Sequence, residues 1–166
     1  MEILDLYDVN RKKMNKKIIR GQKPDANEYC LVVGIWITNG KGQLLTTLRA
    51  PQKRTYPNLW ENTGGMVQSG ESSIQGALRE LREETGIHTE VSELILLASH
   101  IESTAIVDQY LVVKDIPVSD ICLQEGETAV AKWVFVQEFV EMITQGLVAK
   151  PIADRFKKIK QHLINM

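Results

Sequence analysis

One segment constrains this chain more than any other: a glycine-rich stretch from Gly65 to Glu71 that leads into a strongly patterned run ending at Ile87. Ser72 and Gln75 have the spacing of a capping box, which starts a helix. Glu71 lies at the positive end of the resulting helix dipole, and Gly86 is a residue type that ends helices. The segment therefore predicts a loop followed by a helix over residues 72–85.

This predicted helix has an apolar face and a separate acidic face. At about 100° per residue, four apolar side chains share an arc of roughly 100°, which is typical of a helix that packs on a core. Three glutamates share another arc of similar width. The apolar stripe is Ile74, Ala77, Leu78 and Leu81, and the acidic face is Glu80, Glu83 and Glu84.

Carboxylates gathered on one face weaken a helix by repulsion, so their presence needs a reason. Arg79 can pair with Glu83 at the i, i+4 spacing, which offsets part of the repulsion. Clustered oxygen ligands suit Mg²⁺, with Mn²⁺ as the alternative. The glutamates alone are also compatible with a solvated, charge-rich helix face.

In the remaining chain the predicted strands and helices are mixed, without a regular βαβ alternation. This order predicts an α+β fold with a mixed β-sheet flanked by helices. The Asn39–Gly42 turn joins the first two predicted strands as a hairpin. Residues 50–61 form a loop, and a short strand lies within 62–68. The other predicted strands are 29–38, 43–49, 94–99, 106–113 and 131–136, and further helices span 139–145 and 151–165.

The 166 residues favour a single domain. Within it, residues 1–27 form a basic arm or hairpin that packs on the main domain, residues 28–166. The arm has two interpretations: a solvated surface, or a positive rim that helps to hold a phosphate-rich ligand. Its basic residues are Arg11, Lys12, Lys13, Lys16, Lys17, Arg20 and Lys23.

Bulk composition excludes several classes of protein. The net charge of -1 provides no electrostatic footprint for nucleic acid. Cys30 and Cys122 show no pairing pattern, which favours a reducing compartment. Residues 1–10 lack the apolar core of a signal peptide, and no apolar run is long enough to cross a bilayer. A cytoplasmic protein without a membrane partner is expected.

The complete pattern Gly-x5-Glu-x7-Arg-Glu-apolar-x-Glu-Glu-x-Gly-apolar runs without a gap from Gly65 to Ile87. It resembles the Nudix box, and Trp60 and Gly64 precede it as in Nudix hydrolases. The resemblance implies an α/β/α sandwich and an enzyme. It also implies that divalent metal is bound by Glu80, Glu83, Glu84 and the carbonyl of Gly65.

Further site residues follow from the same resemblance. Arg79 would orient a carboxylate together with Glu71. Many family members add a later glutamate as ligand or general base, for which Glu127 is the first candidate and Glu125 the second. The catalytic candidates are therefore Glu71, Arg79, Glu83, Glu84 and Glu127.

A narrower resemblance links this chain to the Nudix subgroup related to type 1 isopentenyl-diphosphate isomerase. It rests on Leu6-Tyr7-Asp8, the basic arm, the 49–60 loop, and Glu127 followed by Trp133. That isomerase uses a cysteine after a Trp-x-x-Thr segment, whereas here the segment ending at Thr63 is followed by glycine. The missing cysteine and metal-binding histidine count against isomerase chemistry.

The predicted activity is Mg²⁺-dependent hydrolysis of a diphosphate linkage in a small phosphoanhydride, a nucleoside diphosphate-X compound. The alternatives are an isomerase-like enzyme, a nucleotide-binding module without catalysis, and an RNA-processing hydrolase. Relatives are commonly homodimers, so a homodimer is a further expectation. Candidate substrate contacts lie in the basic, aromatic loop, at Arg49, Lys53, Arg54 and Tyr56.

Overall fold

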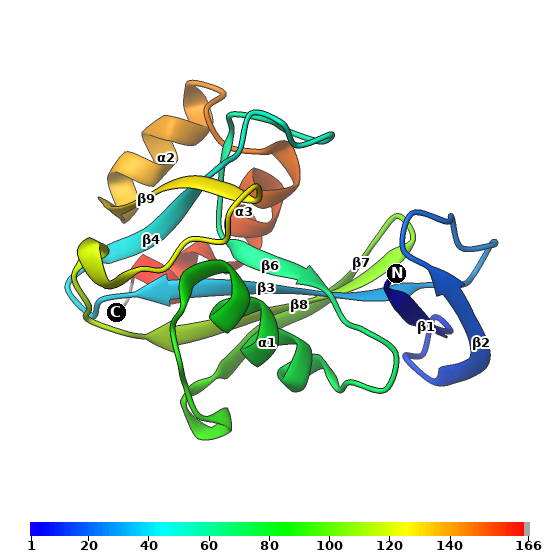
Figure 1. Ribbon diagram of the computed structural model, residues 1–166. Coiled ribbons are helices and arrows are strands. Elements are labelled where there is room, and N and C mark those ends of the chain that lie inside the picture. The colour runs from blue at the N-terminus through cyan, green and yellow to red at the C-terminus, as the bar shows by residue number, and fades with distance from the viewer. Residues whose placement is uncertain (165–166) are drawn as a thin grey trace.

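A mixed sheet of seven strands forms the centre of the molecule, as described by a computed structural model for residues 1–164 (Figure 1). The strand order is β5-β4-β3-β8-β7, with β6 paired to β3 and β9 paired to β4. Strands β3 and β8 run parallel, and the other pairs are antiparallel. The strands are β3 (Cys30–Thr38), β4 (Gln43–Arg49), β5 (Trp60–Glu61), β6 (Thr63–Met66), β7 (Ile95–Glu102), β8 (Ala105–Val113) and β9 (Thr128–Phe135).

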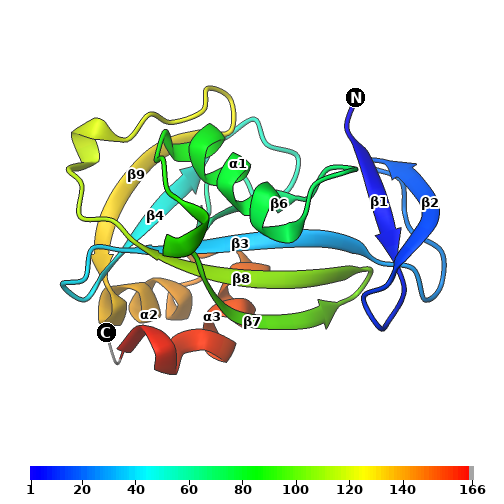
Figure 2. The same cartoon turned by 90° about the horizontal axis from the view of Figure 1, so that it is seen from below.

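Helices cover both faces of this sheet, which confirms the predicted α+β sandwich. The helix α1 (Ser73–Thr85) lies on one face, while α2 (Val136–Thr144) and α3 (Lys150–Ile164) lie on the other (Figure 2). Two short 3-10 turns, η1 (Val91–Glu93) and η2 (Val118–Asp120), lie in the connections. No helix among residues 1–164 is long and apolar enough to cross a membrane.

Side chains of β3 pack alternately into the core on the α1 face of the sheet and into the core on the α2 and α3 face, because successive residues of a strand point to opposite faces. Val33 and Ile35 are fully buried on the α1 side, where they join Ala77 and Leu81 in one apolar cluster. On the other side Trp36 packs among the aromatic residues of α2 and α3. Its ring centroid lies 5.8 Å from that of Phe139 and 5.6 Å from that of Phe156.

The predicted hairpin of β3 and β4 is confirmed, although its two strands pair only next to the turn. Only Thr38 and Leu44 pair between these strands in the described chain, 1–164. Beyond the turn the two strands diverge, because β3 is paired along its length with β8 and β6, while β4 pairs with β9 and β5. The short strands β5 and β6 therefore pass from one diverging strand to the other, close to α1.

Several element boundaries also differ from the prediction. Helix α2 begins at Val136, because the strand before it ends one residue earlier, at Phe135. The last two residues of the predicted 50–61 loop form β5, because they pair with β4. Helix α3 begins at Lys150, and its predicted end at residue 165 lies outside the described residues.

The N-terminal residues form a separate two-stranded hairpin of β1 (Ile3–Tyr7) and β2 (Lys13–Ile19). Two buried carboxylates fix it to the domain. Asp5 accepts hydrogen bonds from Oγ of Ser69 at 2.9 Å and from the backbone N–H of Gly70 at 2.8 Å. Arg11, between the two strands, forms an ion pair with the fully buried Asp108 on β8. The hairpin is thereby held against the loop that precedes α1.

Candidate active site

Helix α1 begins and ends as the sequence predicts. Its capping box joins the N–H of Gln75 to Oγ of Ser72 at 3.3 Å and the N–H of Ser72 to Oε1 of Gln75 at 2.8 Å. At the other end Gly86 has a left-handed φ of 71°, and its N–H donates to the carbonyl of Arg82 at 2.9 Å. These caps fix the register of every side chain between them.

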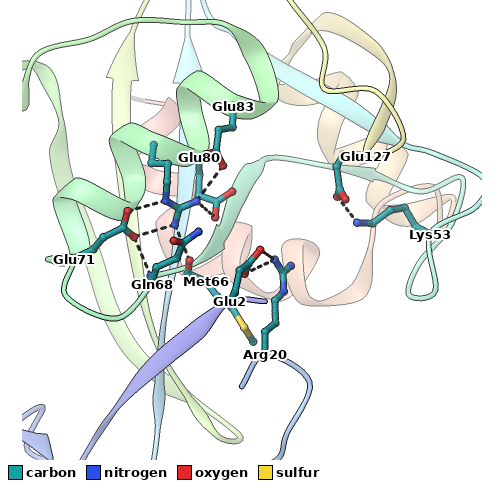
Figure 3. A network of polar contacts seen from close by, with 10 residues as sticks. Glu2, Arg20, Lys53, Met66, Gln68, Glu71, Glu80, Glu83 and Glu127 are labelled. Carbon is teal, nitrogen blue, oxygen red and sulfur yellow. Dashed lines mark hydrogen bonds and ion pairs between the residues drawn. The ribbon is translucent and has the colours of Figure 1, made fainter. Parts of the chain in front are cut away.

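Arg79 is the central cation of the site, because it forms ion pairs with Glu71, Glu80 and Glu83, which are labelled in Figure 3. Its guanidinium donates to Glu71 at 2.7 and 3.0 Å, to Glu80 at 2.8 Å and to the carbonyl of Met66 at 2.9 Å. It also donates to Glu83 at 3.1 Å, which is the i, i+4 pair that the spacing predicts. These contacts, with Glu71 first among them, raise the pKa of Arg79, so this residue stays charged while it orients three carboxylates.

Because Gly65 has no side chain, the carboxylate of Glu80 can lie directly against its backbone. A Cβ built on Gly65 would lie 2.7 Å from Oε2 of Glu80 and closer still to Oε1. Glu80 is buried, and burial raises its pKa even though Arg79 acts in the opposite direction. The backbone of β6 and the first glutamate of the acidic face are therefore in direct contact.

Glu84 and Glu61 form a second pair of carboxylates beside Gly64. The backbone N–H of Gly64 donates to Oε2 of Glu84 at 3.1 Å. Burial raises the pKa of Glu84 well above its ordinary value, and the neighbouring charges of Glu61 and Glu80 raise it further. Burial likewise raises the pKa of Glu61, although its two hydrogen bonds from Arg49 at 2.8 Å oppose the change. Negative charge is therefore concentrated here with few cations to balance it.

The opposite wall of the site comes from two loops. Glu127, on the turn before β9, forms an ion pair with Lys53. Arg49, at the end of β4, binds Glu61 and also donates to the carbonyl of Thr55 at 2.9 Å. Lys53 from the loop and Arg49 from the end of β4 thus lie at the same place as the acidic face of α1.

Most of these groups line one small polar cavity of about 130 Å³, while Glu61 lines an adjacent cavity. The polar cavity includes Arg49, Lys53 and Glu127 among the predicted residues. The other predicted residues that line it are Gly65, Arg79, Glu80, Glu83 and Glu84. Glu71 is not among the described residues that line this cavity, but it is hydrogen-bonded to Arg79, which does line it.

Three candidates lie away from this cavity. Arg54 and Glu125 are exposed, and neither belongs to the described residues that line it. Tyr56 is exposed and lines a different cavity together with Glu102 and Lys150. Substrate contact by Arg54 and Tyr56 stays a prediction.

Sequence reasoning did not single out Glu61, Glu2 or Gln124, and it named Arg20 only as part of the basic arm, for which a positive rim was one interpretation. Glu61 could have been noticed as a carboxylate in a short run between Trp60 and the glycine pair. Glu2 and Arg20 belong to the N-terminal arm, and no spacing rule connects that arm with residues 65–87. They reach the site because Asp5 and Arg11 fix the hairpin there.

The residues of the acidic face have the chemistry that a divalent cation requires. Glu80 and Glu84 are carboxylates with raised pKa values, crowded together beside a glycine pair, so a bound cation would relieve their repulsion. Among residues 1–164, no three carboxylate, histidine or cysteine side chains converge at ligand distances by themselves. Mg²⁺ usually takes one or two protein carboxylates and completes its shell with water and substrate phosphates.

Comparison with known proteins identifies the class. The model of the NUDIX domain matches residues 28–156, so the chain belongs to the Nudix family. The chain is 36% identical over 147 residues to an uncharacterized Nudix hydrolase of Listeria monocytogenes, covering 88% of this chain and 87% of that protein. It is therefore a Nudix hydrolase. A partial similarity, 39% over 66 residues, links it to the isopentenyl-diphosphate Delta-isomerase of Escherichia coli, covering 39% of this chain and 36% of that enzyme.

Solved structures share the fold. The protein DR0079 of Deinococcus radiodurans superposes with a TM-score of 0.79 at 24% identity, covering 95% of this chain and 99% of that one. A bifunctional NMN adenylyltransferase/ADP ribose pyrophosphatase of Francisella tularensis, complexed with AMP and a manganese ion, gives a TM-score of 0.64 at 18% identity. That match covers 86% of this chain and 43% of the other. At these identities the likeness establishes the architecture.

Proposed function

We propose that this protein uses Mg²⁺ to hydrolyse a diphosphate linkage in a nucleoside diphosphate-X compound. The observation that carries the proposal is the crowding of Glu80, Glu84 and Glu61 around the glycine pair, with Arg49 and Lys53 on the facing wall. Carboxylates suit the metal, and cations suit the phosphates. A metal-bound diphosphate between the two walls would contact the carboxylates through the metal and the cations through its phosphate oxygens.

Each group has a role that its position supports. Glu80, Glu83, Glu84 and the carbonyl of Gly65 would hold the metal. Bound divalent ions neutralise phosphate charge and lower the pKa of a water ligand. Arg79, braced by Glu71, keeps Glu80 and Glu83 in place.

The proton of the attacking water goes to a carboxylate of the site. Glu83, Glu84 and Glu127 are the candidates, because all three line the cavity. Lys53 and Arg49 would bind phosphate oxygens, after exchanging part of their pairing with Glu127 and Glu61. Mn²⁺ is the alternative ion, as in the Francisella structure.

The substrate class is proposed from the same site and from the neighbours. The Francisella enzyme is an ADP ribose pyrophosphatase in one of its two activities. We therefore place ADP-ribose and other nucleoside diphosphate sugars first among the compounds to be tested, with dinucleotides and lipid diphosphates after them. We also propose that the protein is cytoplasmic and forms a homodimer.

The test is a panel of phosphoanhydrides assayed with Mg²⁺ and with detection of released phosphate or nucleoside monophosphate. Glu83→Gln keeps the shape of the side chain and removes its charge, so we expect turnover to fall at least about 100-fold. Glu141→Gln is the matched control, because Glu141 is exposed on α2, on the opposite face of the sheet. Removal of divalent ions with EDTA should abolish activity, and added Mg²⁺ should restore it.

Unchanged Mg²⁺-dependent turnover in Glu83→Gln would show that the metal site has been wrongly assigned. Isomerase chemistry gains no support from the two free cysteines. Cys30 packs in the apolar cluster beneath the N-terminal hairpin, and Cys122 lies against Gly86 at the end of α1. Neither is among the described residues that line the cavity.

A further inference from the structure

Arg20, the residue that follows β2, faces the acidic helix from the hairpin side of the site (Figure 3). Its backbone N–H donates to the carbonyl of Glu2 at 2.9 Å, which closes the hairpin beside Ile3 and Ile19. The hairpin itself is fixed by Asp5 to the loop before α1. The position of Arg20 relative to the glutamates is therefore set by folded structure.

Among residues 1–164, the side chain of Arg20 is paired with a single, weakly held partner, Glu2. One guanidinium nitrogen, Nη1, donates to both carboxylate oxygens of Glu2, at 2.9 and 2.8 Å. The Arg20 side chain is 49% exposed and that of Glu2 is 36% exposed. Exposed pairs of this kind contribute little stability, so the guanidinium can change partner at small cost. Its planar fork suits two phosphate oxygens better than one carboxylate approached through a single nitrogen.

Arg20 also lies where two cavities meet. It lines the polar cavity that contains the acidic face of α1, and it lines an adjacent cavity of about 190 Å³. The two cavities share Arg20, Gly64 and Gly65. The lining of the second cavity includes the apolar residues Val32, Met66 and Ile152 and the polar residues Glu61, Asn62 and Arg155. A diphosphate in the first cavity could therefore extend a substituent into the second past Arg20.

We propose that Arg20 exchanges Glu2 for a phosphate of the bound diphosphate, and that it binds the phosphate whose substituent enters the second cavity. This inference rests on the proposed function. Lys53 and Glu127 form a comparable pair on the opposite side of the first cavity. The substrate would then be held by one cation at each end of the diphosphate, with the acidic face of α1 between them.

The test measures binding of inorganic diphosphate in the presence of Mg²⁺ by isothermal titration calorimetry. For Arg20→Gln we expect the Kd to rise about tenfold, the lower end for a charge-assisted hydrogen bond at a half-exposed site. For Glu2→Gln we expect the Kd to fall by roughly two- to fivefold, because the competing carboxylate is gone. Lys23→Gln removes one exposed charge nearby, outside the described lining of both cavities, and should leave the Kd unchanged.

The opposite signs separate substrate binding from a structural ion pair. If the Arg20–Glu2 pair served only to stabilise the hairpin, both variants would break it and change the Kd in the same direction. That result would overturn the proposal, as would an unchanged Kd in Arg20→Gln or no binding of diphosphate by the parent protein. Hydrolysis of the phosphoanhydride panel by the parent is measured separately, so the proposed function can hold even where the role of Arg20 fails.

Discussion

Replacing Gly65 with alanine tests whether the close approach of β6 and α1 is necessary. The added Cβ would meet the carboxylate of Glu80, with Oε2 at 2.7 Å and Oε1 closer. Glu80 has little room to retreat, because it is buried and holds a hydrogen bond from Arg79 at 2.8 Å. Either the carboxylate leaves its position, or β6 moves away from the helix.

Both responses have an expected size. Overpacking in a well-filled region costs typically about 1–3 kcal/mol, which corresponds to a Tm lower by roughly 2–12 °C for a domain of this length. Displacing a catalytic group by about 1 Å costs on the order of 100-fold in rate. We therefore expect Gly65→Ala to be modestly destabilised, to lose about 100-fold in kcat/KM, and to need more Mg²⁺ for half-maximal activity.

The assay combines thermal unfolding with Mg²⁺ titration of phosphoanhydride hydrolysis. Gly34→Ala on the adjacent strand is the control, because its Cβ would meet only the side-chain nitrogen of Asn62, at 3.2 Å. A double-mutant cycle with Glu80→Ala identifies the cause, since removing the carboxylate should cancel most of the cost of Gly65→Ala. Additive destabilisation in that cycle, or full activity in Gly65→Ala, would refute the steric argument.

Two further predictions concern the fold around the site. In Asp108→Asn the loss of the buried partner of Arg11 should lower stability at pH 7 by about 2 kcal/mol, less than for a fully buried pair because Arg11 is partly exposed. Burial raises the pKa of Asp108, but hydrogen bonds from Arg11 and Ser73 lower it more, so the folded value lies below 3.8. The stabilisation is therefore present above pH 3.8 and is lost as the pH falls below it. Denaturant unfolding at several pH values should show the free energies of unfolding of the parent and the variant converging in acid. A difference between them that stays constant with pH would contradict this prediction. Gly86→Ala should lower the free energy of unfolding by about 1–2 kcal/mol more than Gly126→Ala does. Both glycines have a positive φ, but a Cβ at Gly86 would also lie 2.8 Å from the Cβ of Cys122, whereas a Cβ at Gly126 would meet nothing within 4 Å. Equal unfolding midpoints for the two variants would contradict this prediction.

The sequence by itself determined the local features of the site. The caps at Ser72 and Gly86, the apolar stripe through Leu81 and the Arg79–Glu83 pair all depend on residues within a few positions of each other. Helix geometry converts such spacings directly into positions in space. The fold class also followed, because the order of strands and helices limits how their apolar faces can be covered.

The tertiary structure decided which distant residues join the acidic helix. The divergence of β3 and β4, and the passage of β5 and β6 between them, bring Glu61 beside Glu84. Buried contacts of Asp5 and Asp108 bring the N-terminal hairpin, and with it Arg20, to the same cavity. These placements depend on strand pairing and on contacts between residues far apart in the chain, for which sequence spacing carries no periodic signal. The sequence therefore predicted the acidic face and named Arg49, Lys53 and Glu127 as candidates. Their convergence on that face, together with Glu61 and Arg20, required the folded chain.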